Sequence, residues 1–272
     1  MVENAELTQM KNRTRAYMAG VIDGDGHLGI QKHPYCAPAI QFVNESLPLM
    51  KWAALHFGGT FRKENIPSGK DFYRWSLYGK QAQTQFIRDI LPFLLIKKSQ
   101  AKILLEFLMI DSGEYNPEKR EALFLAIREA RTLSSVETET QNKLDDKIAC
   151  AYGAGLVDTD GHIAIRYVKS GKQAGRPLTR IELVNVYKPA LDALQAQFGG
   201  YVLHKKTEEK WTPRYRWLLT DRKNQERFLL AALPYFVAKK DKAQELLNFV
   251  RLKTQPELVG DHESDPTEML VS

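Results

Sequence analysis

The sequence predicts an α+β protein made of two similar units, and two observations support that fold class. The first is an internal duplication: residues 17–27 and 152–162 are identical at seven of eleven positions, at an offset of 135 in a chain of 272 residues. The second is an alternation of apolar and polar residues after each copy, which is typical of strands with one buried face. Two copies on one chain predict half-domains that face each other, so any group near the axis between them occurs twice.

The duplication continues along the chain in a constant order. Four further landmarks recur at offsets of 141 or 142: residues 42–44 at 183–185, 57–59 at 198–200, 73–75 at 215–217, and 91–98 at 233–240. The small drift in the offset places the length differences in loops. Five landmarks in one order predict that both units fold alike.

Each motif predicts a helix with small residues and one acid along a single face. The spacing i, i+3, i+4, i+7 aligns Ala16, Ala19, Gly20 and Asp23 in the first unit and Ala151, Ala154, Gly155 and Asp158 in the second. Glycine lowers helix propensity by about 1 kcal/mol relative to alanine, so such a stripe makes sense where another backbone comes close. We expect the two stripes to pack against each other; the alternative is a helix packed on the sheet of its own unit.

Each helix is expected to end at an Asp-Gly pair and to lead into a two-stranded hairpin. Gly26 and Gly161 suit the left-handed turn that terminates a helix. The expected core face of the strands carries Leu28, Ile30, Ile40 and Phe42 in the first unit and Ile163, Ile165, Ile181 and Leu183 in the second. The outward face carries His27, Gly29, Gln31, His33 and Gln41, matched by His162, Ala164, Arg166, Arg180 and Glu182.

The rest of each unit follows the same alternation of helices and strands. A helix over 47–57 ends at Gly58-Gly59, strands near 60–64 and 72–78 follow, and helices are expected over about 80–92 and 98–110. The order αββαββα predicts antiparallel hairpins with helices on one face. An extra helix over 117–132 completes the first unit. The predicted organisation is an N-terminal half-domain (12–132), a polar linker (133–145), a C-terminal half-domain (146–253) and an acidic tail (254–272).

Composition limits the class of protein. With 43% apolar residues the chain can bury a substantial core, and no apolar run is long enough to span a membrane. The start lacks the order of a secretion signal, and two cysteines without metal-ligand spacing are typical of reduced thiols, so an intracellular location is expected. The tail carries five acids and no Lys or Arg, so its composition predicts disorder. Because the whole chain has a net charge of +6, the chain without this tail has a net charge of +11. A body this basic favours a polyanionic partner, although many basic proteins bind no nucleic acid.

The final acid of each motif is placed where a carboxylate is unfavourable. Asp25 and Asp160 fall at helix C-termini, where the helix dipole disfavours a negative charge by about 0.3–1 kcal/mol. If the stripes pack together, the two carboxylates also repel each other. A divalent cation would relieve both penalties, and oxygen-only ligands favour Mg²⁺. Metal ions that bridge an attacking water and a leaving oxygen are a known route to phosphodiester hydrolysis.

The repeated acids have two alternative explanations. A calcium loop fails on spacing, because position 12 counted from Asp23 or Asp158 is Pro34 or Lys169 instead of a bidentate glutamate. The other alternative is that the acids only make structural hydrogen bonds. We expect that role for Asp23 and Asp158, because they lie on the packing face.

A lysine and an asparagine also recur in both units. Lys97 and Lys239 could stabilise charge on a phosphate or organise water, although the usual fate of a surface lysine is solvation. The lysine that follows each of them recurs too, which leaves open which member of each pair points inward. Asn44 and Asn185 end the second strand, where they either orient water or cap the following helix.

Residues 18–26, Met-Ala-Gly-Val-Ile-Asp-Gly-Asp-Gly, and residues 153–161, Gly-Ala-Gly-Leu-Val-Asp-Thr-Asp-Gly, resemble the LAGLIDADG signature. With two motifs over about residues 12–253, the chain resembles the single-chain LAGLIDADG homing endonucleases. The resemblance implies pseudo-twofold-related units with saddle-shaped sheets in the DNA major groove, and hydrolysis of both strands across the minor groove. It implies divalent metal ions held by Asp25 and Asp160, with help from the backbone carbonyls of Gly24 and Thr159, and Lys97 and Lys239 as the basic residues.

On this resemblance the outward strand residues contact DNA: His27, Gln31, His33, Gln41, Arg62 and Arg74 in the first unit, and Arg166, Arg180, Glu182 and Arg216 in the second. Their donors and acceptors suit base edges in the major groove, although an outward arginine can equally hold a phosphate. Because the two sets differ, the expected target is not a palindrome. The family often has Gln at the end of the second strand, where this chain has Asn44 and Asn185.

The leading interpretation is a site-specific, Mg²⁺-dependent endonuclease that acts as a monomer on a long double-stranded DNA target and is encoded by a mobile intron, with Mn²⁺ or Ca²⁺ able to replace Mg²⁺ for binding. One alternative is an RNA-binding intron maturase, with intron RNA as partner and a basic surface away from the sheets. The other is a DNA-binding regulator with a dead site, which predicts loss of a final acid; both are present. An intein is disfavoured because no splicing block surrounds the units.

Overall fold

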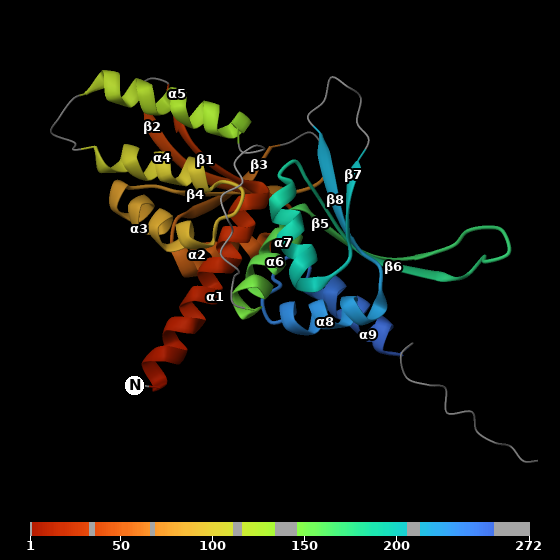
Figure 1. Ribbon diagram of the computed structural model, residues 1–272. Helices are drawn as coiled ribbons and strands as arrows, with labels where there is room; N and C mark the ends of the chain where they lie inside the picture. The colour runs from red at the N-terminus through yellow and green to blue at the C-terminus, as the bar shows by residue number, and fades with distance from the viewer. Residues whose placement is uncertain are drawn as a thin grey trace, which may run out of the picture.

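The computed structural model describes residues 2–32, 36–65, 69–110, 116–133, 146–205 and 213–252. Two four-stranded antiparallel sheets and the helices that cover them form two units with the same element order (Figure 1). The fold is therefore α+β, as the sequence predicts. His33, the linker from 134 to 145 and the tail from 253 lie outside the described residues.

Both units follow the predicted order αββαββα, after which the described part of the first unit continues with two further α-helices and that of the second with one. The first consists of α1 (Val2–Asp25), β1 (Gly26–Gln31), β2 (Ala37–Asn44), α2 (Leu47–Phe57), β3 (Thr60–Glu64), β4 (Phe72–Leu77), α3 (Lys80–Ile90), the 3₁₀ turn η1 (Leu91–Phe93), α4 (Lys98–Met109) and α5 (Pro117–Leu133). The second consists of α6 (Asp146–Asp160), β5 (Gly161–Tyr167), β6 (Pro177–Asn185), α7 (Lys188–Phe198), β7 (Tyr201–Lys205), β8 (Arg214–Leu219), α8 (Arg222–Ala232) and α9 (Lys240–Leu252). The strand order is β1-β2-β4-β3 in one sheet and β5-β6-β8-β7 in the other.

The two faces of each sheet differ as the alternation predicts. The face under the helices is apolar and buried, with Leu28, Ile40, Phe42, Trp75 and Leu77 in the first sheet and Ile163, Ile181, Leu183, Trp217 and Leu219 in the second. Each central tryptophan is anchored by its indole N–H, which donates to the carbonyl of Gly58 at 2.9 Å or Gly199 at 2.8 Å. Those glycines follow α2 and α7 with φ of 71° and 80°, a backbone conformation that favours glycine. The Gly-Gly landmark of the repeat thus ends a helix and receives the core tryptophan.

The motif helices α1 and α6 pack side by side between the two sheets (Figure 1). Their contact is made by the small-residue stripes, as expected, and the alternative of a helix packed only on its own sheet is wrong. A Cβ atom at Gly20 would collide with the carbonyl oxygen of Tyr152, and one at Gly155 would collide with the carbonyl oxygen of Tyr17. Each glycine therefore admits the backbone of the other unit.

The expectation that Gly26 and Gly161 take the left-handed conformation is wrong. Neither has a positive φ, and each is the first residue of a strand, β1 or β5. A Cβ at Gly26 would lie 2.6 Å from Ile22 Cα, and one at Gly161 would lie 2.6 Å from Val157 Cα. Glycine is needed here because the chain turns back sharply against the last turn of its own helix.

Helix α5 lies along the edge strand β1 and against α4 (Figure 1). Ile127 is fully buried and Leu123 is 8% exposed, so the helix joins the core of the first unit. Its last full turn carries Arg131, whose guanidinium reaches the outward face of β1 and lies 3.3 Å from His27 Nε2. Both cysteines are free thiols, and within the described part of the chain no helix is both long and apolar enough to cross a bilayer.

Candidate functional site

The two final acids of the motifs meet where α1 and α6 end. Asp25 is the last residue of α1 and Asp160 is the last residue of α6. Partial burial raises the pKa of both carboxyl groups, and the charge of Asp25 further raises the pKa of Asp160. The repulsion between two carboxylates that the duplication predicted is therefore present, with one carboxylate contributed by each unit.

A lysine caps the end of each motif helix beside these acids. Lys97 Nζ donates hydrogen bonds to three successive carbonyls, those of Ile22 at 2.7 Å, Asp23 at 2.9 Å and Gly24 at 2.9 Å. Lys239 Nζ repeats the pattern on the carbonyls of Val157, Asp158 and Thr159. An ammonium group has three N–H donors, and in each lysine all three donate to carbonyls at the helix end that would otherwise be unpaired.

These contacts answer which lysine of each pair points inward. It is the first, Lys97 or Lys239, whereas Lys98 and Lys240 begin α4 and α9. A positive charge at a helix C-terminus offsets the unfavourable dipole there, so part of the compensation assigned to a metal ion comes from the protein itself. Burial lowers the pKa of both ammonium groups, while the nearby aspartates oppose that shift.

An asparagine orients each acid. Asn44 Nδ2 donates to Asp25 Oδ2 at 2.7 Å, and Asn185 Nδ2 donates to Asp160 Oδ2 at 3.3 Å. The other end of each amide accepts from the backbone N–H two residues on, which fixes the loop before α2 or α7. The asparagines thus link the end of a strand to the acid. Neither caps the following helix, because the N-cap residues of α2 and α7 are Ser46 and Tyr187, and the orientation of water stays a prediction.

The other acid of each motif makes only structural contacts. Asp23 accepts from the backbone N–H groups of Leu95, Ile96 and Lys97, and Asp158 accepts from those of Val237, Ala238 and Lys239. Both carboxylates are buried, at 2% and 1% exposure. These aspartates therefore make the structural hydrogen bonds that the sequence predicted, and those bonds hold the loop that carries the capping lysine.

Sequence reasoning missed a pair of tyrosines that cross between the units. Tyr17 of the first unit donates to Asp158 Oδ2 at 2.6 Å, and Tyr152 of the second donates to Asp23 Oδ2 at 2.9 Å. Burial raises the pKa of both phenols, so they remain protonated donors. The signal was present, because a tyrosine opens both copies of the motif, but the partner could not be known before the helix pairing.

The oxygen atoms at this point fit a hard divalent cation. Two carboxylates and the backbone carbonyls of Gly24 and Thr159 come from the two helix ends, and each carbonyl oxygen keeps a second lone pair beside its lysine. In the described ranges no cluster of three or more His, Cys, Asp or Glu converges. Such a sparse oxygen set leaves coordination positions for water and phosphate, which suits Mg²⁺ better than a soft metal.

The predicted DNA-contacting residues share the outward faces of the sheets. In the first sheet, the register pairs His27 with Gln41, and Arg62 with Arg74, on one face. In the second, His162 pairs with Glu182, and Arg180 lies two residues before Glu182 on the same strand face. Most of the predicted residues are half-buried, and the exposed ones are Gln31, Arg62 and Arg166. His27 lies under Arg131, and burial together with that guanidinium lowers the pKa of its imidazole. His33 cannot be placed, because it lies outside the described residues.

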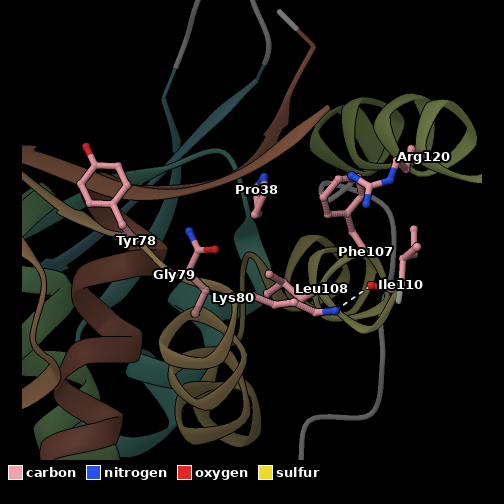
Figure 2. Close-up of a pocket in the computed structure, with 9 residues that line it drawn as sticks. Pro38, Tyr78, Gly79, Lys80, Phe107, Leu108, Ile110 and Arg120 are labelled. Carbon is pink, nitrogen blue, oxygen red and sulfur yellow. Dashed lines mark hydrogen bonds between the residues drawn. The ribbon is translucent and has the colours of Figure 1, made fainter. Parts of the chain in front are cut away.

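A separate hollow of about 340 Å³ opens on the helix side of the first sheet (Figure 2). It is lined by Tyr78, Lys80, Phe107 and Arg120 among others, with Arg120 stacked 5.4 Å from the Phe107 ring. Lys80 donates to the carbonyl of Ile110 at 2.7 Å across this hollow (Figure 2). Tyr78 follows the end of β4 that is remote from Asn44 and Asp25, so the hollow is distinct from the acid site.

Comparison with known sequences gives one distant relative. No protein-family model matches the chain. The intron-encoded RNA maturase bI4 of Saccharomyces cerevisiae is 24% identical over 203 residues, which cover 74% of this chain. The matched region spans only 27% of the length of that maturase.

Comparison with solved structures is more extensive. The LAGLIDADG homing endonuclease I-GzeII in complex with its DNA target has a TM-score of 0.67 at 11% identity, covering 88% of this chain and 90% of that one. The LAGLIDADG homing endonuclease I-LtrWI bound to target DNA scores 0.66 at 12% identity over 89% and 91% of the two chains. I-SmaMI bound to uncleaved DNA with calcium ions scores 0.64 at 13% identity over 88% and 91%. The chain therefore has the two-unit fold of the LAGLIDADG homing endonucleases.

Proposed function

We propose that this protein is a site-specific endonuclease that hydrolyses both strands of an asymmetric double-stranded DNA target with the help of divalent metal ions. The observation that carries the proposal is the meeting of Asp25 and Asp160 at the ends of α1 and α6, between two sheets whose outward faces are rich in Arg, Gln and His. One acid from each unit suits a duplex, which offers one scissile phosphate per strand. The basic body, +11 without the acidic tail, favours the polyanion.

In this proposal the chain's own residues position and stabilise the reacting groups. Asp25 and Asp160, each oriented by its asparagine, would hold the metal ions, and the carbonyl oxygens of Gly24 and Thr159 would be further ligands. When bound, Mg²⁺ supplies charge for the phosphate oxygens and lowers the pKa of its water. Lys97 and Lys239 keep positive charge at the site while donating to the helix carbonyls, so they act on the phosphate through electrostatics.

The fold and the relatives support this proposal without carrying it alone. The similar structures are described as homing endonucleases in complex with DNA, one of them with calcium ions present. The final acids, the capping lysines and the asparagines are all present in both units of this chain, which disfavours a regulator with a dead site.

The experiment that tests the proposal is cleavage selection from a randomised duplex library in Mg²⁺, followed by sequencing of the cut ends. A site-specific enzyme should enrich one non-palindromic sequence and leave cuts on both strands at a fixed offset. Absence of cutting in Mg²⁺ and in Mn²⁺, with DNA binding retained, would point to the regulator. Cutting without sequence preference would contradict site specificity.

A second candidate function, RNA binding as an intron maturase, is favoured by the similarity to the yeast maturase and by the hollow beside α3, α4 and α5. Tyr78 is 68% exposed at one side of this hollow, which Lys80 and Arg120 also line. Exposed aromatic rings and cations are the groups on which unpaired RNA bases stack and phosphates bind. Tyr78→Ala should weaken binding of the intron RNA that contains the coding sequence and leave DNA cleavage unchanged. Equal RNA binding by both proteins would remove this candidate surface.

A further inference from the structure

On the outward face of the first sheet, a glutamate lies between two arginines. Arg74 donates to Glu64 with two atoms of its guanidinium, Nε to Oε1 at 3.0 Å and Nη2 to Oε2 at 3.3 Å. Arg62 donates to the same Oε1 at 3.2 Å. The Glu64 side chain is only 18% exposed, and the hydrogen bonds from Arg74 and Arg62 lower the pKa of its carboxyl group. Arg74 is therefore held in one direction by a paired contact.

The second sheet has a similar group built from different positions. Glu182 lies 3.2 Å from Arg216 Nε and 3.3 Å from Arg180 Nη1, and its side chain is 15% exposed. The Arg216 contact is an ion pair without hydrogen-bond geometry, because Arg216 Nε is buried and has no hydrogen-bond partner among the described residues. Arg216 is thus held less rigidly than Arg74.

The two arginines are equivalent in the repeat, but their acids are not. Arg74 pairs with Val43 and Arg62 in the first sheet, and Arg216 pairs with Val184 and Leu203 in the second. The acid of the first group is on β3, where the second unit has Lys205. The acid of the second group is on β6, where the first unit has Gln41. The carboxylate therefore lies on opposite sides of the arginine-bearing strand in the two units. It is on β3 beside β4 in the first unit and on β6 beside β8 in the second.

The register also shows in which direction along its strand each arginine side chain leans toward its glutamate. Glu64 is level with Phe72, at the start of β4, so Arg74 leans toward the strand end near Asn44 and Asp25. Glu182 is level with Leu218, toward the end of β8, so Arg216 leans away from Asn185 and Asp160. Successive residues on a strand are about 3.4 Å apart, which is close to the rise of one base pair.

We propose that Glu64 and Glu182 are positioning residues that set which base pair each repeat-related arginine reads, and that Arg74 reads a base pair nearer the cut than Arg216 does, by at least one position. This inference rests on the proposed DNA-cleaving function and deepens it. Because a guanidinium presents a flat fork of donors, a carboxylate that holds one edge fixes where the remaining N–H groups point. Glu182 then acts through its arginines instead of contacting a base itself.

The competing explanation is that the two glutamates only reduce the positive charge of the DNA-facing surface. In that case, replacing either one would tighten binding to every duplex equally. A positioning role predicts that the base preference changes at one base pair as well.

The test is binding of Glu64→Gln and Glu182→Gln to a set of duplexes that carry each base change along the selected target. Glu226→Gln is the matched control, since it removes one carboxylate that pairs with Arg251 at 3.0 Å on helices of the opposite face. We expect each sheet variant to lose about 5- to 150-fold of discrimination at one base pair, the range for a bidentate arginine contact. The Glu64-dependent base pair should lie nearer the cut. Affinity for non-target DNA should rise in both variants, and the control should show neither change.

An exchange variant supplies a gain of function. Gln41→Glu combined with Glu64→Gln places the acid of the first sheet where Glu182 stands in the second, so the base pair that depends on Arg74 should move away from the cut. Cooperative thermal unfolding would show that the variants are folded. Uniform tightening with unchanged base preference in all three sheet variants would overturn the positioning role. A wild-type protein without any base preference would instead refute the proposed function.

Discussion

At the scale of single residues, the centre of the molecule holds groups that repel each other in the absence of metal ions. Asp25 and Asp160 lie at negative helix ends and near each other, and their pKa values are raised mainly by burial. Lys97 and Lys239 reduce that cost by capping the same helix ends. The protein's own groups thus offset part of the repulsion that a bound cation would relieve in the proposed function.

The first prediction concerns these acids. Asp25→Asn or Asp160→Asn should abolish metal-dependent cleavage, because each removes a charged metal ligand, while DNA affinity and the fold persist. Metal-free stability should rise slightly, since a repulsion is relieved. Plasmid cleavage in Mg²⁺ paired with gel-shift affinity gives the measurement. Undiminished double-strand cutting by Asp25→Asn would show that the metal-site assignment is wrong.

Asp23→Asn is the informative contrast. It should lower stability by about 1–3 kcal/mol, because a buried carboxylate that accepts from three backbone N–H groups and a phenol would lose an acceptor.

The second prediction follows from the raised carboxyl pKa values. Between the usual value of 3.8 and the raised native values, the folded protein binds more protons than the unfolded chain, so stability without metal should fall as pH rises through that window. The fall should be smaller in the double variant Asp25→Asn/Asp160→Asn, which retains the buried Asp23 and Asp158. Urea unfolding in EDTA at a series of pH values measures this. Identical pH profiles for the two proteins would contradict the raised values.

At the scale of elements, the helix pair α1–α6 decides the architecture. Gly20 and Gly155 bring the two backbones together, and the stripes bury fully. The sheets lie on either side of this helix pair. Their outward faces take no part in its packing, so the residues there can differ between the units.

The third prediction separates close approach from helix propensity. Gly20→Ala should destabilise the protein by several kcal/mol, since its Cβ would meet the Tyr152 carbonyl and the backbone N of Leu156 at 2.8 Å. Gly153→Ala is the matched control, because its Cβ would make ordinary contacts of 3.4–3.5 Å with side chains. The control should be neutral or gain up to about 1 kcal/mol from helix propensity. Thermal unfolding of the two variants would show the contrast, and equal stability would refute the close-approach argument.

Most helices, strands and buried faces could be predicted from the sequence, because the repeated motifs and the alternation of apolar residues are visible in short stretches of the chain. Helix α2 has the expected bounds, and the core and outward faces of β1, β2, β5 and β6 are as expected. The crossed tyrosines could not be predicted, since they depend on the pairing of two helices far apart in the chain. The role of Glu64 could not be predicted either, since it depends on the register between β3 and β4. Gly26 was misassigned because a glycine in a sequence does not distinguish a left-handed φ from a close approach.

At the scale of the whole molecule, two units with the same skeleton present different surfaces to a partner. The outward residues diverge, as at Gln41 against Glu182, and α5 reaches the first sheet only, through Arg131 and His27, within the described part of the chain. A symmetric scaffold can thus serve the asymmetric target that we propose.

The fourth prediction is the composition of the complex. One chain should bind one duplex, with one unit on each half-site, because both acids are already present on a single chain. Light scattering of the DNA complex would give the mass. Two chains per duplex would refute this arrangement.

The fifth prediction is a strong dependence of DNA affinity on salt. The basic body should displace many counterions, and contacts to six or more phosphates would reduce affinity by about 10³-fold or more between 50 and 200 mM salt. Arg166→Ala should lower the slope by about one contact if it holds a phosphate, and should alter preference at one base pair if it reads a base. Titrations by fluorescence anisotropy at several salt concentrations distinguish the two outcomes. An unchanged slope and unchanged preference would remove Arg166 from the interface.

The crossed bonds from Tyr17 to Asp158 and from Tyr152 to Asp23 have a consequence for how such a protein can evolve. Each unit places its phenol in the buried centre of the other, so neither half is chemically complete when it is inherited alone. A gene that joined halves from two ancestors would keep a sound centre as long as both brought the same tyrosine and aspartate. Among the described residues, the outward faces of the sheets are not tied by hydrogen bonds of this kind that cross between the units. On the proposed function, new targets can therefore arise one half-site at a time, while the contacts that join the two halves are retained.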